Sequence, residues 1–220
     1  MTSVLTTTES IETLADLLAQ LGDIAPERVR FRPPPGTATT KDVLEVHSRA
    51  GRLCELVDGV LVEKAMGFRE SFLAIALSAI LWGFVKPRRL GVVTGEAGMM
   101  RLASGLVRIP DVAFVSWERF PDRRLPTEPI PDLAPDLAVE VLSPNNTPRE
   151  MARKRQEYFA TGVRLVWLVD PAARTVEVYT APESSTHLRE QDTLDGGVVL
   201  PGFTLPLQEL FAELDRQGEI

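Results

Sequence analysis

The stretch from Pro135 to Gly162 constrains the fold more than any other part of this chain. It opens with a short apolar run that carries a single acid, Glu140, and turns at Ser-Pro-Asn-Asn. A capping box from Thr147 to Glu150, with proline at the first helical position, then starts a helix that ends at Gly162. A carboxylate inside an apolar strand needs a cation, a metal ion or several donors. The strand must therefore bring Glu140 to such a partner.

The elements around this stretch predict an α/β protein whose mixed sheet is flanked by helices. Residues 163–169 form a second apolar run, so a strand, a helix and a parallel strand are expected in succession. Asp58-Gly59 lies between alternating residues and predicts a hairpin over residues 53–62. A long helix is expected over residues 68–85, with an apolar face made of Phe72, Ile75, Ala76, Ala79 and Ile80.

The remaining segments carry weaker patterns. Residues 91–102 are expected to form a strand or loose hairpin with residues 107–116 as its partner, and the proline-rich residues 117–135 an irregular connection. Residues 175–179 alternate as a strand, a further strand is expected near Val198, and a short helix over residues 205–214. At the other end, a helix over residues 11–21 precedes three consecutive prolines. We therefore expect residues 1–36 to be a helix and connector, and residues 37–220 to be the domain.

Composition excludes several classes of function. The chain has 220 residues, a net charge of -7 and a pI near 5.0, which argues against a broad basic surface for nucleic acid. One cysteine and two histidines leave no Cys/His set for structural zinc. With one cysteine, no secretory segment and no apolar run of membrane-spanning length, a cytoplasmic protein without a membrane partner is expected.

Glu140 and Lys154 are predicted to be neighbours. Lys154 lies about six residues into the helix, so it has returned roughly 9 Å along the strand, which is about the rise of three strand residues. A structural ion pair of Glu140 with Lys154 or Arg153 is the alternative to a catalytic role. Lys154 also belongs to an Arg-Lys-Arg run of the kind that is usually a solvated face.

Asp111 precedes another apolar strand and can supply a second carboxylate beside Glu140. Two adjacent carboxylates repel unless a cation bridges them, and Mg²⁺ or Mn²⁺ would suit hydrolysis of a phosphodiester. Glu70 on the long helix and Glu96 between glycines are further candidate metal ligands, and Glu70 a candidate catalytic residue. Each has a structural alternative: Asp111 can cap a turn, Glu70 can complement the helix dipole, and Glu96 can belong to a tight turn.

These residues carry a resemblance. Pro110-Asp111, then Glu140 in an apolar strand, then a lysine resembles the PD-(D/E)XK nuclease superfamily. More narrowly, the chain resembles the Uma family, classed as restriction endonucleases, over about residues 40 to 205. The matching segments are residues 53–64 (LCELVDGVLVEK), 108–116 (RIPDVAFVS), 135–144 (PDLAVEVLSP) and 154–169, together with Asp170-Pro171.

The resemblance implies a restriction-endonuclease-like fold, DNA cleavage that depends on Mg²⁺ or Mn²⁺, and a metal site of Asp111 and Glu140. It implies a DNA substrate that is double-stranded and, by analogy with enzymes that cut both strands, a homodimer. The superfamily places its lysine two residues after the acid, where this chain has Leu142, so Lys154 is the matching position. Two alternatives stay open: a catalytically silent binding or regulatory module with the same fold, and an enzyme for another phosphorylated substrate.

Overall fold

A computed structural model describes residues 11–216. Its helices are α1 (Leu14–Gln20), α2 (Thr40–Ala50), α3 (Phe68–Arg88), α4 (Pro148–Ala160) and α5 (Leu207–Ala212), with 3-10 turns at Pro26–Arg28, Trp117–Arg119, Pro121–Arg123 and Glu213–Asp215. Its strands are β1 (Val29–Arg30), β2 (Cys54–Val57), β3 (Val60–Glu63), β4 (Gly91–Thr94), β5 (Met100–Ala103), β6 (Leu106–Arg108), β7 (Val112–Ser116), β8 (Leu137–Val141), β9 (Leu165–Asp170), β10 (Thr175–Ala181), β11 (Ser184–Arg189), β12 (Thr193–Asp195) and β13 (Thr204–Pro206).

The larger sheet has the strand order β11-β10-β9-β8-β7-β4 and contains the predicted strand–helix–strand unit. β8 and β9 are parallel and are joined by α4, whereas the other neighbours in this sheet are antiparallel. Alternate residues of these strands pack on opposite faces, one against α3 and one against α4. Glu140 has the parity of Ala138, which packs on the α4 side.

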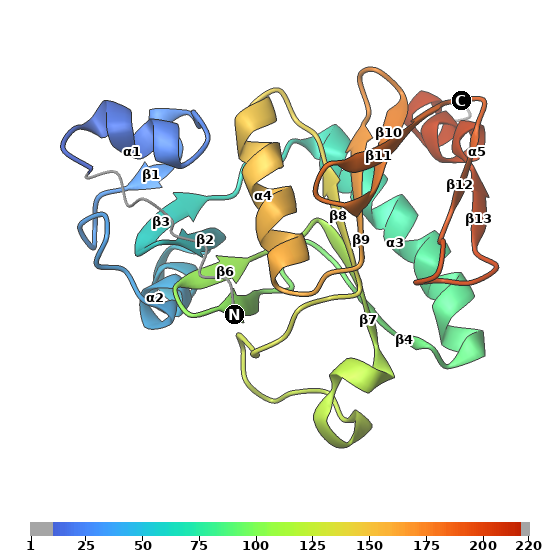
Figure 1. Cartoon of the computed structure of the whole chain (residues 1–220), viewed down its shortest axis with the longest axis horizontal. Helices are drawn as coiled ribbons and strands as arrows, with labels where there is room; N and C mark the ends of the chain where they lie inside the picture. Colours follow the sequence, from blue (N-terminus) through green and yellow to red (C-terminus); the bar gives the residue numbers. More distant parts are fainter. Residues whose placement is uncertain (1–10, 217–220) are drawn as a thin grey trace.

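The smaller sheet, β1-β3-β2-β6-β5, is antiparallel and is built on the predicted hairpin of β2 and β3. Asp58 and Gly59 both have positive φ, as a two-residue hairpin turn requires. Figure 1 shows this sheet with α1 and α2 on one side of the molecule, and α4 between it and the larger sheet. The mixed architecture flanked by helices is therefore confirmed.

Residues 91–116 do not form the single hairpin expected from their sequence. β4 and β7 pair in the larger sheet, while β5 and β6 pair in the smaller one. The chain thus crosses between the sheets twice, the second time at residues 109–111. The strand expected near Val198 is also wrong, because β12 and β13 flank that position and Val198 itself is 84% exposed.

The buried face of α3 differs from the predicted one. Leu73, Ala74, Leu77, Leu81 and Val85 face the core, whereas Ile75 is 63% exposed. Because α3 carries apolar residues on every side, periodicity could not identify the inward face. Among the described residues α3 is also the one helix long and apolar enough to cross a membrane by length and composition.

The segment before residue 37, which the sequence predicts to be a helix and connector outside the domain, packs against the smaller sheet through residues 17–30. α1 begins after a capping box at Thr13, and Leu17 and Leu21 bury against Val57 and Val60. β1 pairs with β3, and Arg28 forms a buried bidentate ion pair with Glu150 at the start of α4 (2.7 and 2.9 Å). Residues 17–30 are thus integrated into the folded unit that contains the site.

Candidate active site

Glu140 lies beneath α4 and contacts two of its side chains. The ammonium of Lys154 is 3.1 Å from Glu140 Oε2, and the hydroxyl of Tyr158 donates to Oε1 at 2.6 Å. All three residues are almost fully buried. α4 starts where its proline and Thr147 cap dictate, so Lys154 reaches the level of Glu140 as the helical rise predicted. The predicted neighbourhood is confirmed, and the catalytic role stays a prediction.

Asp111 is held beside Glu140 by the backbone of β8. Its amide donates to the carbonyl of Val139 (3.0 Å), and its Oδ2 accepts from the amide of Val141 (2.6 Å). These two bonds bracket Glu140, and the pairing of Val112 with Val139 sets the same register. The structure therefore brings the two predicted metal ligands together from adjacent strands.

Lys64, at the end of the β2–β3 hairpin, is the closest cation to Asp111. Its ammonium lies 2.7 Å from Asp111 Oδ1 and donates to the carbonyl of Ile109 at 2.7 Å. Asp111 Oδ1 nevertheless accepts no well-aligned hydrogen bond and is buried. We regard the contact as a charge pair without hydrogen-bond geometry, which leaves this oxygen with an unused lone pair.

A third buried carboxylate, Glu55 of β2, joins the cluster from the smaller sheet. Its Oε1 lies 3.2 Å from the ammonium of Lys154 and accepts from the amide of Ile109 at 3.1 Å. Its Oε2 accepts from the guanidinium of Arg108 at 2.6 Å. Arg108 in turn donates to Glu157 of α4 (2.8 Å). Lys154 is thus shared by Glu140 and Glu55.

Burial and the neighbouring charges shift the pKa values of the two acids that share Lys154 in opposite directions. Burial raises the pKa of Glu55, but Lys154, Arg108 and Lys64 outweigh it and lower the pKa to about 2. Burial raises the pKa of Glu140, and Asp111 and Glu55 add to the rise against the effect of Lys154. Burial alone would lower the pKa of Lys154, yet Glu140 and Glu55 raise it. Of these two acids, Glu140 is therefore the one whose charged form is less stabilised by its surroundings.

The acids present fit a hard divalent cation. Asp111 and Glu140 supply oxygen ligands from neighbouring strands, Asp111 Oδ1 faces only the Lys64 ammonium, and burial, followed by Asp111 and Glu55, raises the pKa of Glu140. Mg²⁺ is held by one or two carboxylates with water and phosphate oxygens completing its shell. In residues 11–216 no group of three or more Asp, Glu, His or Cys side chains is placed to hold an ion.

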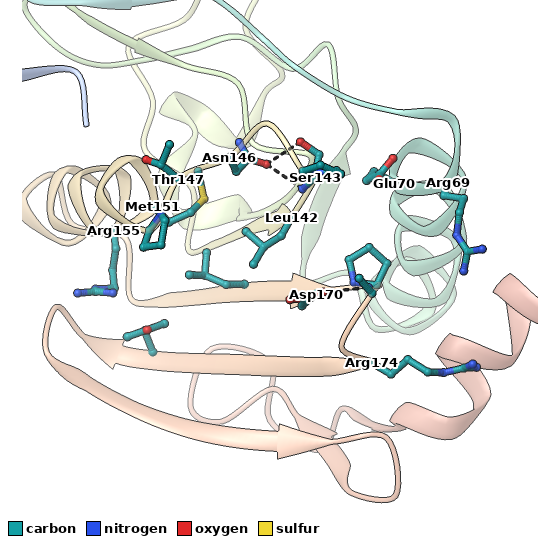
Figure 2. A pocket seen from close by; sticks show the side chains of 16 residues that line it. Arg69, Glu70, Leu142, Ser143, Asn146, Thr147, Met151, Arg155, Asp170 and Arg174 are labelled. Atoms are coloured by element: carbon teal, nitrogen blue, oxygen red, sulfur yellow. Dashed lines mark hydrogen bonds between the residues drawn. The ribbon is translucent and has the colours of Figure 1, made fainter. Parts of the chain in front are cut away.

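Glu96 and Glu70 lie outside this pair of carboxylates. The Glu96 side chain accepts from Ser71 of α3 (3.2 Å), and its backbone carbonyl is 3.5 Å from the Lys64 ammonium. Glu70 lines a separate cavity of about 810 Å³ at the carboxyl ends of β8 and β9. Figure 2 shows Glu70 on α3, across this cavity from Met151 and Arg155 of α4. The four-carboxylate set expected from the sequence is therefore not assembled around Asp111 and Glu140.

Sequence reasoning missed Lys64, Glu55 and Arg108, and passed over Tyr158 as a packing residue. Glu55 carries the signal that singled out Glu140, a lone acid flanked by apolar residues in a predicted strand. Lys64 has no such local signal, because its partner is 47 positions away (64 to 111) in another sheet. Arg108 becomes recognisable only once Glu55 and Glu157 are seen on either side of it.

Comparisons with known proteins agree with the fold of the chain. Residues 40–208 match the Uma2 family, described as "Putative restriction endonuclease". A solved structure, described as a putative nuclease of DUF820 from Anabaena variabilis, aligns with a TM-score of 0.67 and 22% identity. The alignment covers 75% of this chain and 93% of that one, which supports the restriction-endonuclease-like fold. A search among curated proteins returns no match.

Proposed function

This chain belongs to the Uma2 family, described as "Putative restriction endonuclease", and we propose that it is a nuclease that hydrolyses phosphodiester bonds of DNA with the help of a divalent cation. Asp111 and Glu140 are the proposed ligands of Mg²⁺ or Mn²⁺. When bound, the cation would supply charge stabilisation at the phosphate and a more acidic water. The observation that carries the proposal is the pair of buried carboxylates on adjacent strands with a lysine beside each.

Lys154 is the proposed orienting group for the attacking water. Its ammonium has three donors; it donates to Glu140 and lies 3.2 Å from Glu55, so at least one donor remains for a water or a phosphate oxygen. Tyr158 fixes the other oxygen of Glu140, which limits rotation of that carboxylate. Glu55 acts through Lys154 and Arg108 and is a positioning residue.

Lys64 has a different part in the proposal. Its ammonium lies 2.7 Å from Asp111 Oδ1, so a divalent cation held by that oxygen would compete with Lys64 for it. An ammonium released from Asp111 would be available to pair with the negatively charged phosphate of the substrate. Both lysines thereby serve the same reaction, Lys64 from beside Asp111 and Lys154 from beside Glu140.

Cleavage of supercoiled plasmid with Mg²⁺ or Mn²⁺ tests the proposal. Wild-type protein should nick the plasmid, and Glu140→Ala and Asp111→Asn should each lower the rate at least about a hundredfold. Arg189→Ala, on exposed β11, is a matched control that should cleave like wild type. Equal activity of the Glu140 and Asp111 variants with wild type would refute the metal site.

A silent binding or regulatory module is the second candidate, favoured by the lysine that already pairs with each carboxylate. Calorimetric titration with Mg²⁺ separates the two candidates, because a silent module should give no heat that depends on Asp111.

We also propose the homodimer implied by cleavage of both strands. Sedimentation equilibrium tests it, with Ile75→Glu on the exposed side of α3 as the variant that should shift the protein toward monomer.

A further inference from the structure

The cavity beside the acid pair is lined in part by two segments that the proposed chemistry does not use. Ser143-Pro144 lies just past the end of β8 and Asp170-Pro171 spans the end of β9, so both lie at the carboxyl ends of the two parallel strands. In open α/β sheets this edge, outside the carboxyl ends of parallel strands, is where ligands bind. Both segments also belong to the resemblance that the sequence carries, without a role assigned to them.

The cavity is adjacent to the catalytic pair along two elements at once. Leu142 lies just past the end of β8, two residues beyond Glu140 and with the same parity, a distance of roughly 7 Å along an extended chain. Met151 and Arg155 lie within one turn of Lys154 on α4. A DNA strand with a phosphate at Glu140 would therefore have its neighbouring nucleotide at the cavity.

The lining of the cavity suits a nucleobase and a negatively charged group. Leu142, Met151 and Leu168 give an apolar wall, and the guanidinium of Arg155 stacks over the Tyr179 ring at 4.4 Å. Arg155 Nε is buried and has no hydrogen-bond partner, and its other contact is a 3.4 Å pair with exposed Glu183. A buried guanidinium nitrogen without an acceptor is costly, so a ligand oxygen at this point would be stabilising.

The size of the cavity suits a single nucleotide. About 810 Å³ is within the range of small-molecule sites. We propose that the cavity binds one unstacked nucleotide next to the scissile phosphate, with its base against the apolar wall and its phosphate or base oxygen on Arg155. The proposal rests on the proposed nuclease function, and it adds that a nucleotide must leave the helical stack to enter.

Fluorescence anisotropy in EDTA tests the proposal without cleavage. The probes are two labelled hairpin DNAs, one fully paired and one with a single unpaired nucleotide in its stem. Wild-type protein should bind the second about tenfold more tightly, since stacking of one base is worth that much. Arg155→Ala should remove the preference, and Leu142→Trp, which fills the cavity from β8, should do the same. Arg189→Ala should keep it, and thermal melting should confirm that each variant is folded.

Equal binding of both hairpins by wild type would overturn the subsite, as would a preference that survives in both cavity variants. Plasmid cleavage, measured separately with Mg²⁺, distinguishes the two proposals. Cleavage without any preference for the unpaired nucleotide rejects the subsite and leaves the nuclease function standing. A preference without cleavage supports the subsite and rejects the proposed chemistry.

Discussion

Replacing Lys154 with methionine should destabilise the protein more than any other single lysine substitution. The ammonium lies 3.1 Å from Glu140 and 3.2 Å from Glu55, and all three side chains are at most 5% exposed. At an effective dielectric constant of about 20, each contact corresponds to about 5 kcal/mol of attraction before the cost of desolvation. Lys154→Met keeps the volume of the side chain but leaves two carboxylates facing one another without their shared cation.

The net cost of removing one partner from a buried ion pair is about 3–5 kcal/mol. For a domain of this size, 1 kcal/mol corresponds to a change in Tm of about 2–4 °C. Lys154→Met should therefore lower Tm by about 6–20 °C, measured by circular dichroism and urea unfolding. Lys41→Met, at an exposed position on α2, is the matched control and should change the free energy of unfolding by less than about 0.5 kcal/mol.

A second substitution tests the electrostatic reasoning itself. Glu140→Gln, added to Lys154→Met, removes a charge that has lost its cation and should recover about 1–3 kcal/mol. Glu55→Gln should recover less, because Glu55 keeps its bond from Arg108 at 2.6 Å. A cost below about 1 kcal/mol for Lys154→Met, or the absence of coupling with Glu140, would refute the claim that both acids depend on this lysine.

Three further predictions follow from the same charges. The folded-state pKa of Glu140 is raised above its ordinary 4.5, first by burial and then by Asp111 and Glu55, so its contribution to stability is present below pH 4.5 and is lost as pH rises through the raised pKa. Urea unfolding should therefore show that wild type loses stability relative to Glu140→Gln as the pH rises above 4.5; parallel pH profiles would contradict this. Lys64→Met removes the cation that competes for Asp111 and should tighten Mg²⁺ binding roughly fivefold by calorimetry, whereas weaker binding would mean that Lys64 organises the site. Arg28→Met leaves Glu150 buried without its bidentate partner and should cost about 3–5 kcal/mol of stability with no change in Mg²⁺ affinity; loss of affinity would show that the N-terminal segment shapes the site.

The part of the site that lies within one strand–helix unit was predictable from the sequence. Glu140 and Lys154 are 14 positions apart, and the strand rise, the turn and the capped helix together fix their relative height. Asp58-Gly59 was predictable for a similar reason, because only a two-residue turn with positive φ at both positions fits the flanking pattern. In both cases the constraint is local.

The contacts that come from the other sheet were not predictable in this way. The run from Val107 to Ser116 looks like one continuous strand, yet it leaves the smaller sheet after Arg108 and enters the larger one at Val112. Ile109-Pro110-Asp111 is the crossing point, and proline there removes a ladder donor. Because of this crossing, Arg108 belongs to the smaller sheet and Asp111 lies at the entrance to the larger one, although only three positions separate them.

α4 explains why charged residues are buried at this point. Glu150, Lys154 and Glu157 recur at helical spacing and face the smaller sheet and N-terminal segment, where they meet Arg28, Glu55 and Arg108 respectively. Met151 and Tyr158 point instead to the larger sheet. The two sheets are thus joined through α4 by ion pairs, in which each removed partner leaves a buried charge. Lys154 belongs both to this joint and to the acid pair, because its ammonium lies 3.1 Å from Glu140 in the larger sheet and 3.2 Å from Glu55 in the smaller one.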